Sequence, residues 1–178
     1  EACTLCPRLC GVDRTIRTGY CGSGSLAKVA RAAKHHWEEP CISADNGSGT
    51  VFFSGCNMGC SFCQNSQISD GSHGTEITVE RLADIFIELQ EQDAHNINLV
   101  TPTTYVLQII EAIKIAKENG LKIPIIYNSN GYENVETLKL LNGYIDVYLP
   151  DLKYYTNELS KKYSKIDNYF ETATKAIQ

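Results

Sequence analysis

The spacing of hydrophobic residues changes near residue 50 of this chain. From Thr50 onward, short apolar runs alternate with stretches in which apolar residues recur every three or four positions. The short runs are typical of buried strands, and the wider spacing is typical of amphipathic helices. The pattern predicts strands at 51–53, 97–100, 123–127 and 145–149, and helices at 78–89, 106–116, 135–141 and 169–177.

Polar residues and glycines mark where these predicted helices begin and end. Thr78 and Thr104 each precede a helical stretch, and a threonine hydroxyl can accept a hydrogen bond from a free N–H group of the first turn. Gly120 follows the second helix, where a left-handed residue commonly ends a helix. Asn130 and Gly131 together predict a plain turn.

Strands that alternate with helices predict an α/β fold with a parallel sheet. Right-handed connections bring the loops after the strands to one edge of such a sheet, where ligands usually bind. These loops are 55–74, 101–105, 128–133 and 150–157. An eightfold barrel needs about 250 residues. We therefore expect residues 49–178 to form a truncated, partial (β/α) barrel of about four βα units, within a longer protein.

Residues 1–48 are rich in Cys, Gly, Arg and Ser and show little periodicity, so they predict a separate Cys-rich N-terminal extension. His35 and His36 are adjacent, and adjacent side chains point apart in helices and strands. We therefore interpret residues 35–39 as a linker that packs Trp37 onto the barrel, and not as a metal site.

Composition narrows the classes of function. With 43% apolar and 21% charged residues, the chain resembles an ordinary globular domain. A net charge of −5 argues against nucleic-acid binding, which usually needs a basic face. No apolar run approaches the roughly 18 residues of a membrane span, and the first residues do not resemble a signal peptide. We expect a cytoplasmic location and no membrane association.

Eight cysteines lie in the first 63 residues, and the remaining 115 residues contain none. A disulfide scaffold spreads its cysteines through a short secreted chain, whereas clustered cysteines in a cytosolic protein indicate metal sites or reactive thiols. The cysteines are Cys3, Cys6, Cys10, Cys21, Cys41, Cys56, Cys60 and Cys63.

Three of them form a compact motif directly after the first predicted strand. Cys56, Cys60 and Cys63 have the spacing C-x3-C-x2-C, and Gly55 and Gly59 allow a tight backbone path around them. Iron–sulfur clusters usually have four cysteine ligands, so three local ligands leave one iron open for chemistry. The alternatives are a zinc ribbon or a set of free thiols, and a zinc ribbon prefers pairs of C-x2-C, which this spacing fits poorly.

This motif, with the aromatic residue Phe62 before its last cysteine and βα units after it, resembles the radical S-adenosylmethionine (SAM) superfamily. Further segments resemble pyruvate formate-lyase-activating-enzyme-like proteins, so that the resemblance covers nearly the whole chain. These segments are 3–11, 49–55, 63–65 and 148–154.

The resemblance implies a partial barrel of radical SAM type that binds a [4Fe-4S] cluster and S-adenosylmethionine. Cys56, Cys60 and Cys63 would each hold one iron, and S-adenosylmethionine would chelate the fourth. Its reductive cleavage would yield a 5′-deoxyadenosyl radical for hydrogen abstraction. Phe62 would lie beside the adenine, although core packing is the alternative. The implied partners are a glycyl radical enzyme as substrate and flavodoxin or ferredoxin as electron donor.

The other loops depart in part from this family pattern. Where the family often has Gly-Gly-Glu to hold the methionine amino group, this chain offers the hydroxyls of Thr101 and Thr103. Asn128 stands where some activating enzymes have Asp, and it keeps an acceptor but loses the charge. Asp151 and Lys153 point to the same side of the chain and are candidate catalytic residues by resemblance. An ordinary exposed ion pair is the alternative.

The N-terminal cysteines have the spacing C-x2-C-x3-C-x10-C in Cys3, Cys6, Cys10 and Cys21. Four thiolates fit zinc, a second iron–sulfur cluster or a metal-free structural role, and spacing alone does not separate zinc from iron. Cys41 belongs to neither set and is expected to be a buried small apolar residue.

Two functional classes follow from the sequence. The first is a radical SAM oxidoreductase, with activation of a glycyl radical enzyme as one candidate activity. The second is a non-catalytic iron–sulfur or zinc protein for electron transfer or interaction.

Overall fold

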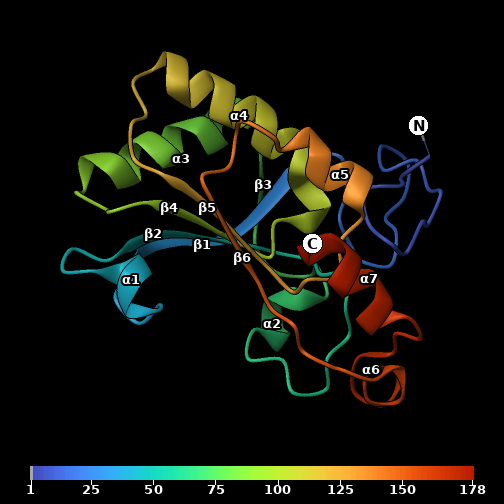
Figure 1. Ribbon diagram of the computed structural model, residues 1–178. Coiled ribbons are helices and arrows are strands. Elements are labelled where there is room, and N and C mark those ends of the chain that lie inside the picture. The colour runs from blue at the N-terminus through green and yellow to red at the C-terminus, as the bar shows by residue number, and fades with distance from the viewer. Residues whose placement is uncertain (1) are drawn as a thin grey trace.

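A six-stranded mixed sheet runs through the computed structural model, which describes residues 2–178. Its strand order is β3-β1-β2-β4-β5-β6 (Figure 1). The strands β2, β4, β5 and β6 are parallel, whereas β1 runs antiparallel to both β2 and β3. The strands are β1 (Ala27–His35), β2 (Ser48–Phe53), β3 (Thr75–Ile77), β4 (Ile97–Val100), β5 (Ile125–Ser129) and β6 (Val147–Pro150).

Helices lie on both sides of this sheet. Figure 1 shows α3, α4 and α5 over one face, with α1 and α2 on the opposite side. The four predicted strands and the four predicted helices are all present, with ends shifted by a few residues. The helices are α1 (Pro40–Ser43), α2 (Ser66–Ser69), α3 (Val79–Glu91), α4 (Val106–Glu118), α5 (Val135–Leu140), α6 (Asn157–Ser164) and α7 (Tyr169–Ile177).

The predicted helix ends are partly correct. Thr78 caps α3 by accepting a hydrogen bond from the Arg81 N–H at 3.2 Å. Gly120 follows α4 with a positive φ of 97°. The predicted cap at Thr104 is wrong, because a short 3-10 turn at Thr103–Tyr105 precedes α4. The Thr104 hydroxyl instead accepts a hydrogen bond from Ser23.

One face of the sheet forms the main core with α3 and α4. Val51 and Phe53 of β2, Leu99 of β4 and Ile125 of β5 are fully buried there against residues such as Phe86 of α3. Burial of each large side chain of this kind stabilises the fold by about 1.5–3 kcal/mol. Alternation along the strands then directs the intervening residues to the opposite face.

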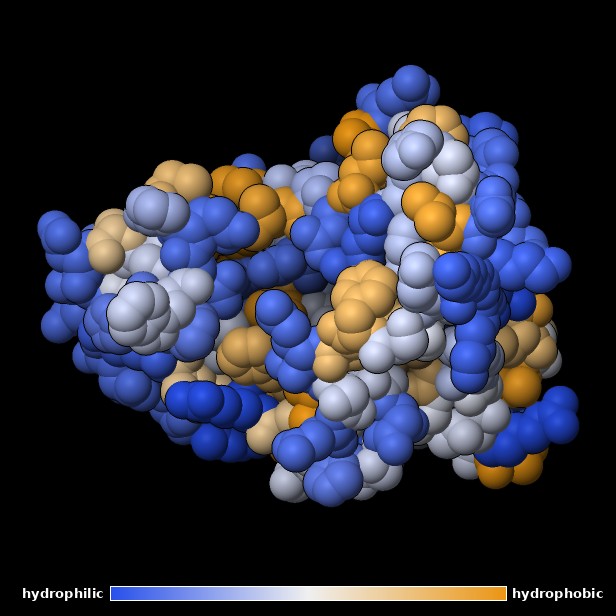
Figure 2. Space-filling model, turned by 90° about the horizontal axis from the view of Figure 1, so that it is seen from below, coloured by the Kyte–Doolittle hydropathy of each residue, from blue (hydrophilic) through white to orange (hydrophobic). Residues whose placement is uncertain are grey.

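That opposite face carries a row of half-buried residues across the four parallel strands. Phe52, Val100, Asn128 and Leu149 are neighbours in register, each near the carboxyl end of its strand. Figure 2, the view from below, shows a recess near the centre of this side of the molecule. We call this row the floor, since a molecule bound beneath the sheet would rest on it.

Five strands and α-helices within residues 2–178 were not predicted from the sequence, and these are β1, β3, α1, α2 and α6. Residues 27–35, assigned above to the N-terminal extension, form β1 and pair with β2 within the main sheet. Four of these nine residues are alanine, which has a weak preference for strands. Pairing with β2 and β3 decides the structure of this segment.

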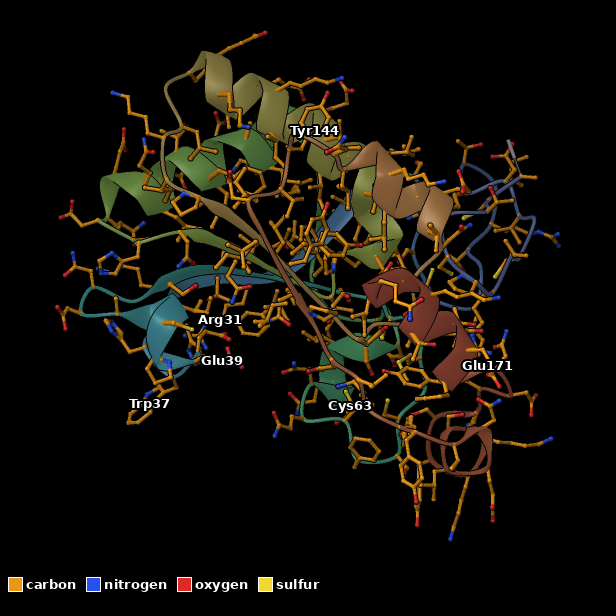
Figure 3. The ribbon with its side chains drawn as sticks, in the orientation of Figure 1. Arg31, Trp37, Glu39, Cys63, Tyr144 and Glu171 are labelled. Atoms are coloured by element: carbon orange, nitrogen blue, oxygen red, sulfur yellow. The ribbon has the colours of Figure 1, made fainter. Side chains whose placement is uncertain are left out.

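Two expectations about the segment after β1 are wrong. Trp37 is 88% exposed and projects away from the sheet, so it does not pack onto the barrel (Figure 3). Cys41 is exposed, not buried.

No helix within residues 2–178 is long and apolar enough to cross a membrane.

Candidate functional site

The loop that carries Cys56, Cys60 and Cys63 leaves the sheet at the carboxyl end of β2. The buried Ser54 fixes this exit, because its hydroxyl donates to the Ile68 carbonyl at 3.0 Å and its carbonyl accepts from the Tyr105 hydroxyl at 2.8 Å. Gly55 follows with a φ of +89°, and a Cβ atom there would lie 2.6 Å from the Cys21 carbonyl oxygen. The loop is therefore built directly against the N-terminal segment.

Each of the three thiols has a distinct environment. The Cys56 sulfur accepts hydrogen bonds from the Met58 N–H at 3.4 Å and the Asn130 amide at 3.5 Å. Burial raises the pKa of the Cys56 thiol to about 11, against the opposing effect of these bonds. The Cys60 sulfur accepts a hydrogen bond from the Ser164 hydroxyl at 2.9 Å. Cys63 is half-buried and lies at the loop before α2 (Figure 3).

The three thiols of this loop are better suited to an iron–sulfur cluster than to a single metal ion. Charge on Cys60 and on Cys63 raises the pKa of Cys56, so the three thiols are close enough to interact. Within residues 2–178, no three His, Cys, Asp or Glu side chains converge closely enough to bind one metal ion. An iron–sulfur cluster instead takes one thiolate at each of several irons. Cys56, Cys60 and Cys63 would hold three of them.

Two buried asparagines join the cysteine loop to the loop after β5. The Asn57 amide donates to the Tyr132 carbonyl at 2.6 Å and accepts from the Asn130 amide at 2.8 Å. Asn130 also contacts the Cys56 sulfur, so its role extends beyond the plain turn predicted for it. Neither residue stands out in the sequence, because the network forms only when two distant loops meet.

The loop after β4 has an unusual backbone at Thr101. This residue has a φ of +59°, which is rare for a β-branched residue and indicates local strain. Its N–H donates to the Asn128 carbonyl at 3.0 Å, so these two predicted cofactor-binding residues lie side by side. Strained backbone is often retained at functional sites.

Thr103 points elsewhere, toward a carboxyl group that the sequence analysis missed. Its buried hydroxyl donates to Glu133 at 2.6 Å, and the Tyr127 hydroxyl donates to the same carboxyl group at 3.4 Å. Burial raises the pKa of Glu133 to about 7, although these hydrogen bonds favour the charged form. Glu133 and Tyr127 line a cavity of about 270 Å³ between β5, β6, α5 and α7.

The remaining predicted site residues lie at the same edge. Lys153 and Asp151 form an ion pair, which is the alternative that the sequence also allowed for them. The Tyr169 hydroxyl fixes their backbone, since it donates to the Asp151 carbonyl at 2.9 Å and accepts from the Lys153 N–H at 2.9 Å. Phe62 is 56% exposed and meets the ring of Tyr154 edge-on, with 6.3 Å between ring centroids, so it is not part of the core.

The N-terminal segment lies across the ends of three parallel strands. Arg8 donates to the Asn57 carbonyl of the β2 loop at 2.9 Å, and Arg14 donates to the Thr104 carbonyl of the β4 loop. The Asn134 amide of the β5 loop donates to the Thr4 carbonyl at 3.0 Å. Figure 1 shows the segment at the same end of the sheet as α7.

All four N-terminal cysteines line one small cavity within this segment. Cys6 and Cys21 are buried, Cys3 is half-buried and Cys10 is exposed. Burial, together with a smaller effect of charge on the other three cysteines, raises the pKa of the Cys6 thiol to about 12. The structure thus brings Cys3, Cys6, Cys10 and Cys21 together.

The fold and the cysteine loop define a partial (β/α) barrel with a thiolate-rich site at the carboxyl ends of its parallel strands. Over residues 50–178 the chain matches the Radical SAM superfamily, and it belongs to that family. The family implies a [4Fe-4S] cluster and S-adenosylmethionine. The three thiols are suitable ligands for such a cluster, and the floor beside them offers a surface for S-adenosylmethionine.

Named relatives support the narrower resemblance to activating enzymes. The chain is 34% identical to an uncharacterized protein of Methanocaldococcus jannaschii over 95% of this chain and 50% of that protein. It is 29% identical to the pyruvate formate-lyase-activating enzyme of Clostridium pasteurianum over 58% of this chain and 44% of that enzyme.

A third relative is another protein of M. jannaschii, provisionally named a glycyl-radical enzyme activating enzyme. It is 33% identical over 60% of this chain and 43% of that protein. The chain spans about half the length of the curated relatives it matches.

The close approach at Gly55 gives a first prediction. Gly55→Ala places a Cβ atom against the Cys21 carbonyl and the Ser23 hydroxyl, each 2.6 Å away, at a residue with positive φ. We expect a loss of about 2 kcal/mol in the free energy of unfolding, together with weaker iron retention. Urea denaturation and iron analysis measure the two effects.

Gly120→Ala is the matched control for Gly55→Ala. Gly120 has a φ of +97° but nothing lies within 4 Å of a Cβ atom there. It should lose only about 1 kcal/mol, the cost of the backbone conformation, and keep its iron. Equal losses in the two variants would contradict close packing between the cysteine loop and the N-terminal segment.

Proposed function

We propose that this chain is an oxidoreductase that cleaves S-adenosylmethionine reductively and uses the resulting 5′-deoxyadenosyl radical to abstract hydrogen from a substrate. The observation that carries the proposal is the position of Cys56, Cys60 and Cys63. They follow β2, the first parallel strand of this family member, at the carboxyl ends of the strands and beside the half-buried floor.

In this proposal, the chain's own residues hold and orient the cofactors. Cys56, Cys60 and Cys63 hold three irons of the [4Fe-4S] cluster, which when bound supplies one electron to S-adenosylmethionine. Hydrogen bonds from Asn130 and Ser164 to the sulfurs of Cys56 and Cys60 disperse thiolate charge. Such bonds tune the reduction potential of a cluster.

The loops after β4, β5 and β6 complete the proposed site. Thr101 presents its strained backbone beside Asn128, the polar residue of the floor, and both would orient the methionine part of the cofactor. The Thr103 hydroxyl donates to Glu133, so it is not free to bind the cofactor directly. Thr103 would support the site only through this contact between the loops after β4 and β5. Asp151 and Lys153 would meet the incoming substrate as a catalytic pair.

The proposed substrate is a glycyl radical enzyme, because two of the relatives carry activating-enzyme names. The proposed electron donor is a flavodoxin or a ferredoxin, and the proposed location is the cytoplasm. Nucleic acid is not a proposed partner, in view of the net charge of −5. The four N-terminal thiols are proposed to hold a second metal centre, either zinc or an iron–sulfur cluster.

Electron paramagnetic resonance tests the proposal on protein reconstituted with iron and sulfide without oxygen. The reduced protein should give a cluster signal that changes when S-adenosylmethionine is added, and 5′-deoxyadenosine should accumulate. A non-catalytic iron–sulfur protein, the second class that the sequence allows, would give a signal that ignores S-adenosylmethionine and would form no 5′-deoxyadenosine.

Phe62 gives a second prediction. Because this side chain is more than half exposed, Phe62→Ala should change the free energy of unfolding by less than about 1 kcal/mol. Loss of the ring beside the adenine should weaken S-adenosylmethionine binding roughly three- to tenfold. Titration of the cluster signal gives the affinity, and Phe62→Tyr should keep it. Lost stability with unchanged affinity would favour the packing role.

A further inference from the structure

The cavity of the N-terminal segment brings together four thiols and an arginine that is only partly satisfied: one of its nitrogen atoms donates to the Thr104 carbonyl, and two others have no acceptor among the described residues. Cys3, Cys6, Cys10 and Cys21 line it together with Arg14. The Nε and Nη2 atoms of Arg14 are buried and have no hydrogen-bond acceptor among residues 2–178. Buried guanidinium N–H groups are costly to leave unsatisfied. The cavity is therefore suited to a group with negative charge and several acceptor atoms.

We propose that Cys3, Cys6, Cys10 and Cys21 hold an iron–sulfur cluster, which receives an electron from an acidic one-electron carrier protein and passes it to the cluster at Cys56, Cys60 and Cys63. The sulfides and thiolates of such a centre are the acceptors that the Arg14 N–H groups lack. The electron-transfer part of this inference rests on the proposed function, whereas the metal site itself does not.

The arrangement of the thiols favours an iron–sulfur cluster over zinc. A structural zinc ion binds its four ligands in one tight tetrahedron, with Zn–S distances of about 2.3 Å. No three metal-binding side chains within residues 2–178 lie close enough to share one ion. A four-iron cluster binds one thiolate per iron and so accepts thiols that are spaced farther apart around one cavity.

The position of this cavity suits electron transfer toward the radical site. Cys10 is exposed, whereas Cys21 is buried and its carbonyl abuts Gly55, the residue before Cys56. Arg8 donates to the carbonyl of Asn57, which follows Cys56. The cavity thus extends from the surface, at Cys10, to the loop that carries Cys56, Cys60 and Cys63, with no helix or strand of the described chain between them.

The surface around Cys10 suits an acidic carrier. Residues 3–21 contain three arginines and one aspartate, although the whole chain has a net charge of −5. Of these arginines, Arg17 is exposed and the other two are half-buried. Leu9 and Ile16 are exposed beside them. The net positive charge of this segment, with Arg17 at the surface and exposed apolar residues beside it, would attract and hold an acidic partner, and the association should weaken with salt.

The electron balance of the proposed relay is simple. A reduced flavodoxin or ferredoxin is oxidised by one electron, and the N-terminal cluster is reduced by one electron. That cluster is then reoxidised as the second cluster is reduced. No bond or proton changes in these two transfers, and the electron is finally consumed when the carbon–sulfur bond of S-adenosylmethionine breaks.

Metal analysis of a triple variant tests the site without relying on activity. The Cys56/Cys60/Cys63→Ala protein, reconstituted with iron and sulfide, should retain about four irons and give a reduced-cluster paramagnetic signal. A further Cys3/Cys10→Ala change, which removes two of the four thiolates, should remove this iron, whereas Cys41→Ala, at an exposed cysteine outside both sets, should not. Zinc, or no metal, in the triple variant would overturn the proposal.

A second measurement decides the case if the triple variant does not fold. The unmodified chain should bind about eight irons, and the Cys3/Cys10→Ala protein about four. Four irons in both proteins would overturn the site. Arg14→Gln should keep the iron but shift the N-terminal cluster to a more negative reduction potential, because a nearby positive charge is lost. An unchanged potential would contradict contact between Arg14 and the cluster.

Comparison of two reductants tests the relay. The Cys3/Cys10→Ala change should lower flavodoxin-driven cleavage of S-adenosylmethionine at least roughly tenfold more than dithionite-driven cleavage, since a small reductant reaches the second cluster directly. Equal losses with both reductants would overturn the relay. If the unmodified chain cleaves no S-adenosylmethionine with either reductant, the proposed function fails, while the iron content still decides the metal site.

Discussion

The Cys60→Ala protein should form no 5′-deoxyadenosine above background, which is the largest effect we expect from a single substitution. Removal of one of three local thiolates leaves a second iron without a protein ligand, and the Ser164 hydroxyl loses the sulfur to which it donates. A protein that cannot hold the cluster cannot deliver the electron. Chromatographic assay of 5′-deoxyadenosine under reducing conditions measures the loss.

Cys41→Ala is the matched control for this experiment. Cys41 is exposed and lies outside both cysteine sets, so its removal should leave cleavage at the level of the unmodified protein. Unchanged formation of 5′-deoxyadenosine by Cys60→Ala would contradict the assignment of the cluster site. Loss of activity in Cys41→Ala as well would show that general thiol damage, and not ligation, explains the result.

The second large effect concerns the pH dependence of stability at Glu133. Its pKa rises from an ordinary value near 4.5 to about 7 in the folded chain because the carboxyl group is buried. The folded state therefore binds the proton more tightly than the unfolded state. The free energy of unfolding should fall by about 3 kcal/mol as pH rises from about 4.5 to 7, and this contribution should be constant outside that window.

Urea denaturation between pH 4 and pH 8 measures this dependence in the unmodified chain and in Glu133→Gln. The amide is neutral throughout, so the difference between the two proteins should grow with pH up to about 7. Glu136→Gln, at an exposed carboxylate nearby, should retain the dependence of the unmodified chain. Identical pH profiles for Glu133→Gln and the unmodified chain would contradict the raised pKa.

The parallel half of the fold was predictable from sequence because each strand and helix carries its own periodic signal. The helix α3, for example, combines a regular apolar stripe with a threonine cap, and both are local features. The strand β1 was missed because its alanine-rich sequence carries no strong signal. Its structure depends on antiparallel pairing with residues of β2 and β3 that lie 13 to 50 positions further along the chain.

In the candidate site, too, the residues that form a local sequence motif were predicted, whereas those that depend on contacts between distant segments were not. The spacing of Cys56, Cys60 and Cys63 is a local signal, and it placed the loop correctly after the first parallel strand. Asn57, Asn130 and Glu133 gave no signal, because each gains its partner only when loops from different strands meet. Buried polar networks of this kind depend on the complete fold.

The N-terminal segment has a consequence for the order of folding and cofactor insertion. Thr4 accepts its hydrogen bond from a residue 130 positions later, and Arg8 reaches the carbonyl of Lys165, 157 positions later. Contacts so distant in sequence form late, since much of the chain must already be ordered. The N-terminal cysteines leave the ribosome before these partners, and they are thus among the last cysteines of the chain to reach their final positions. During synthesis these thiols remain open to metal delivery until residues near 165 are in place.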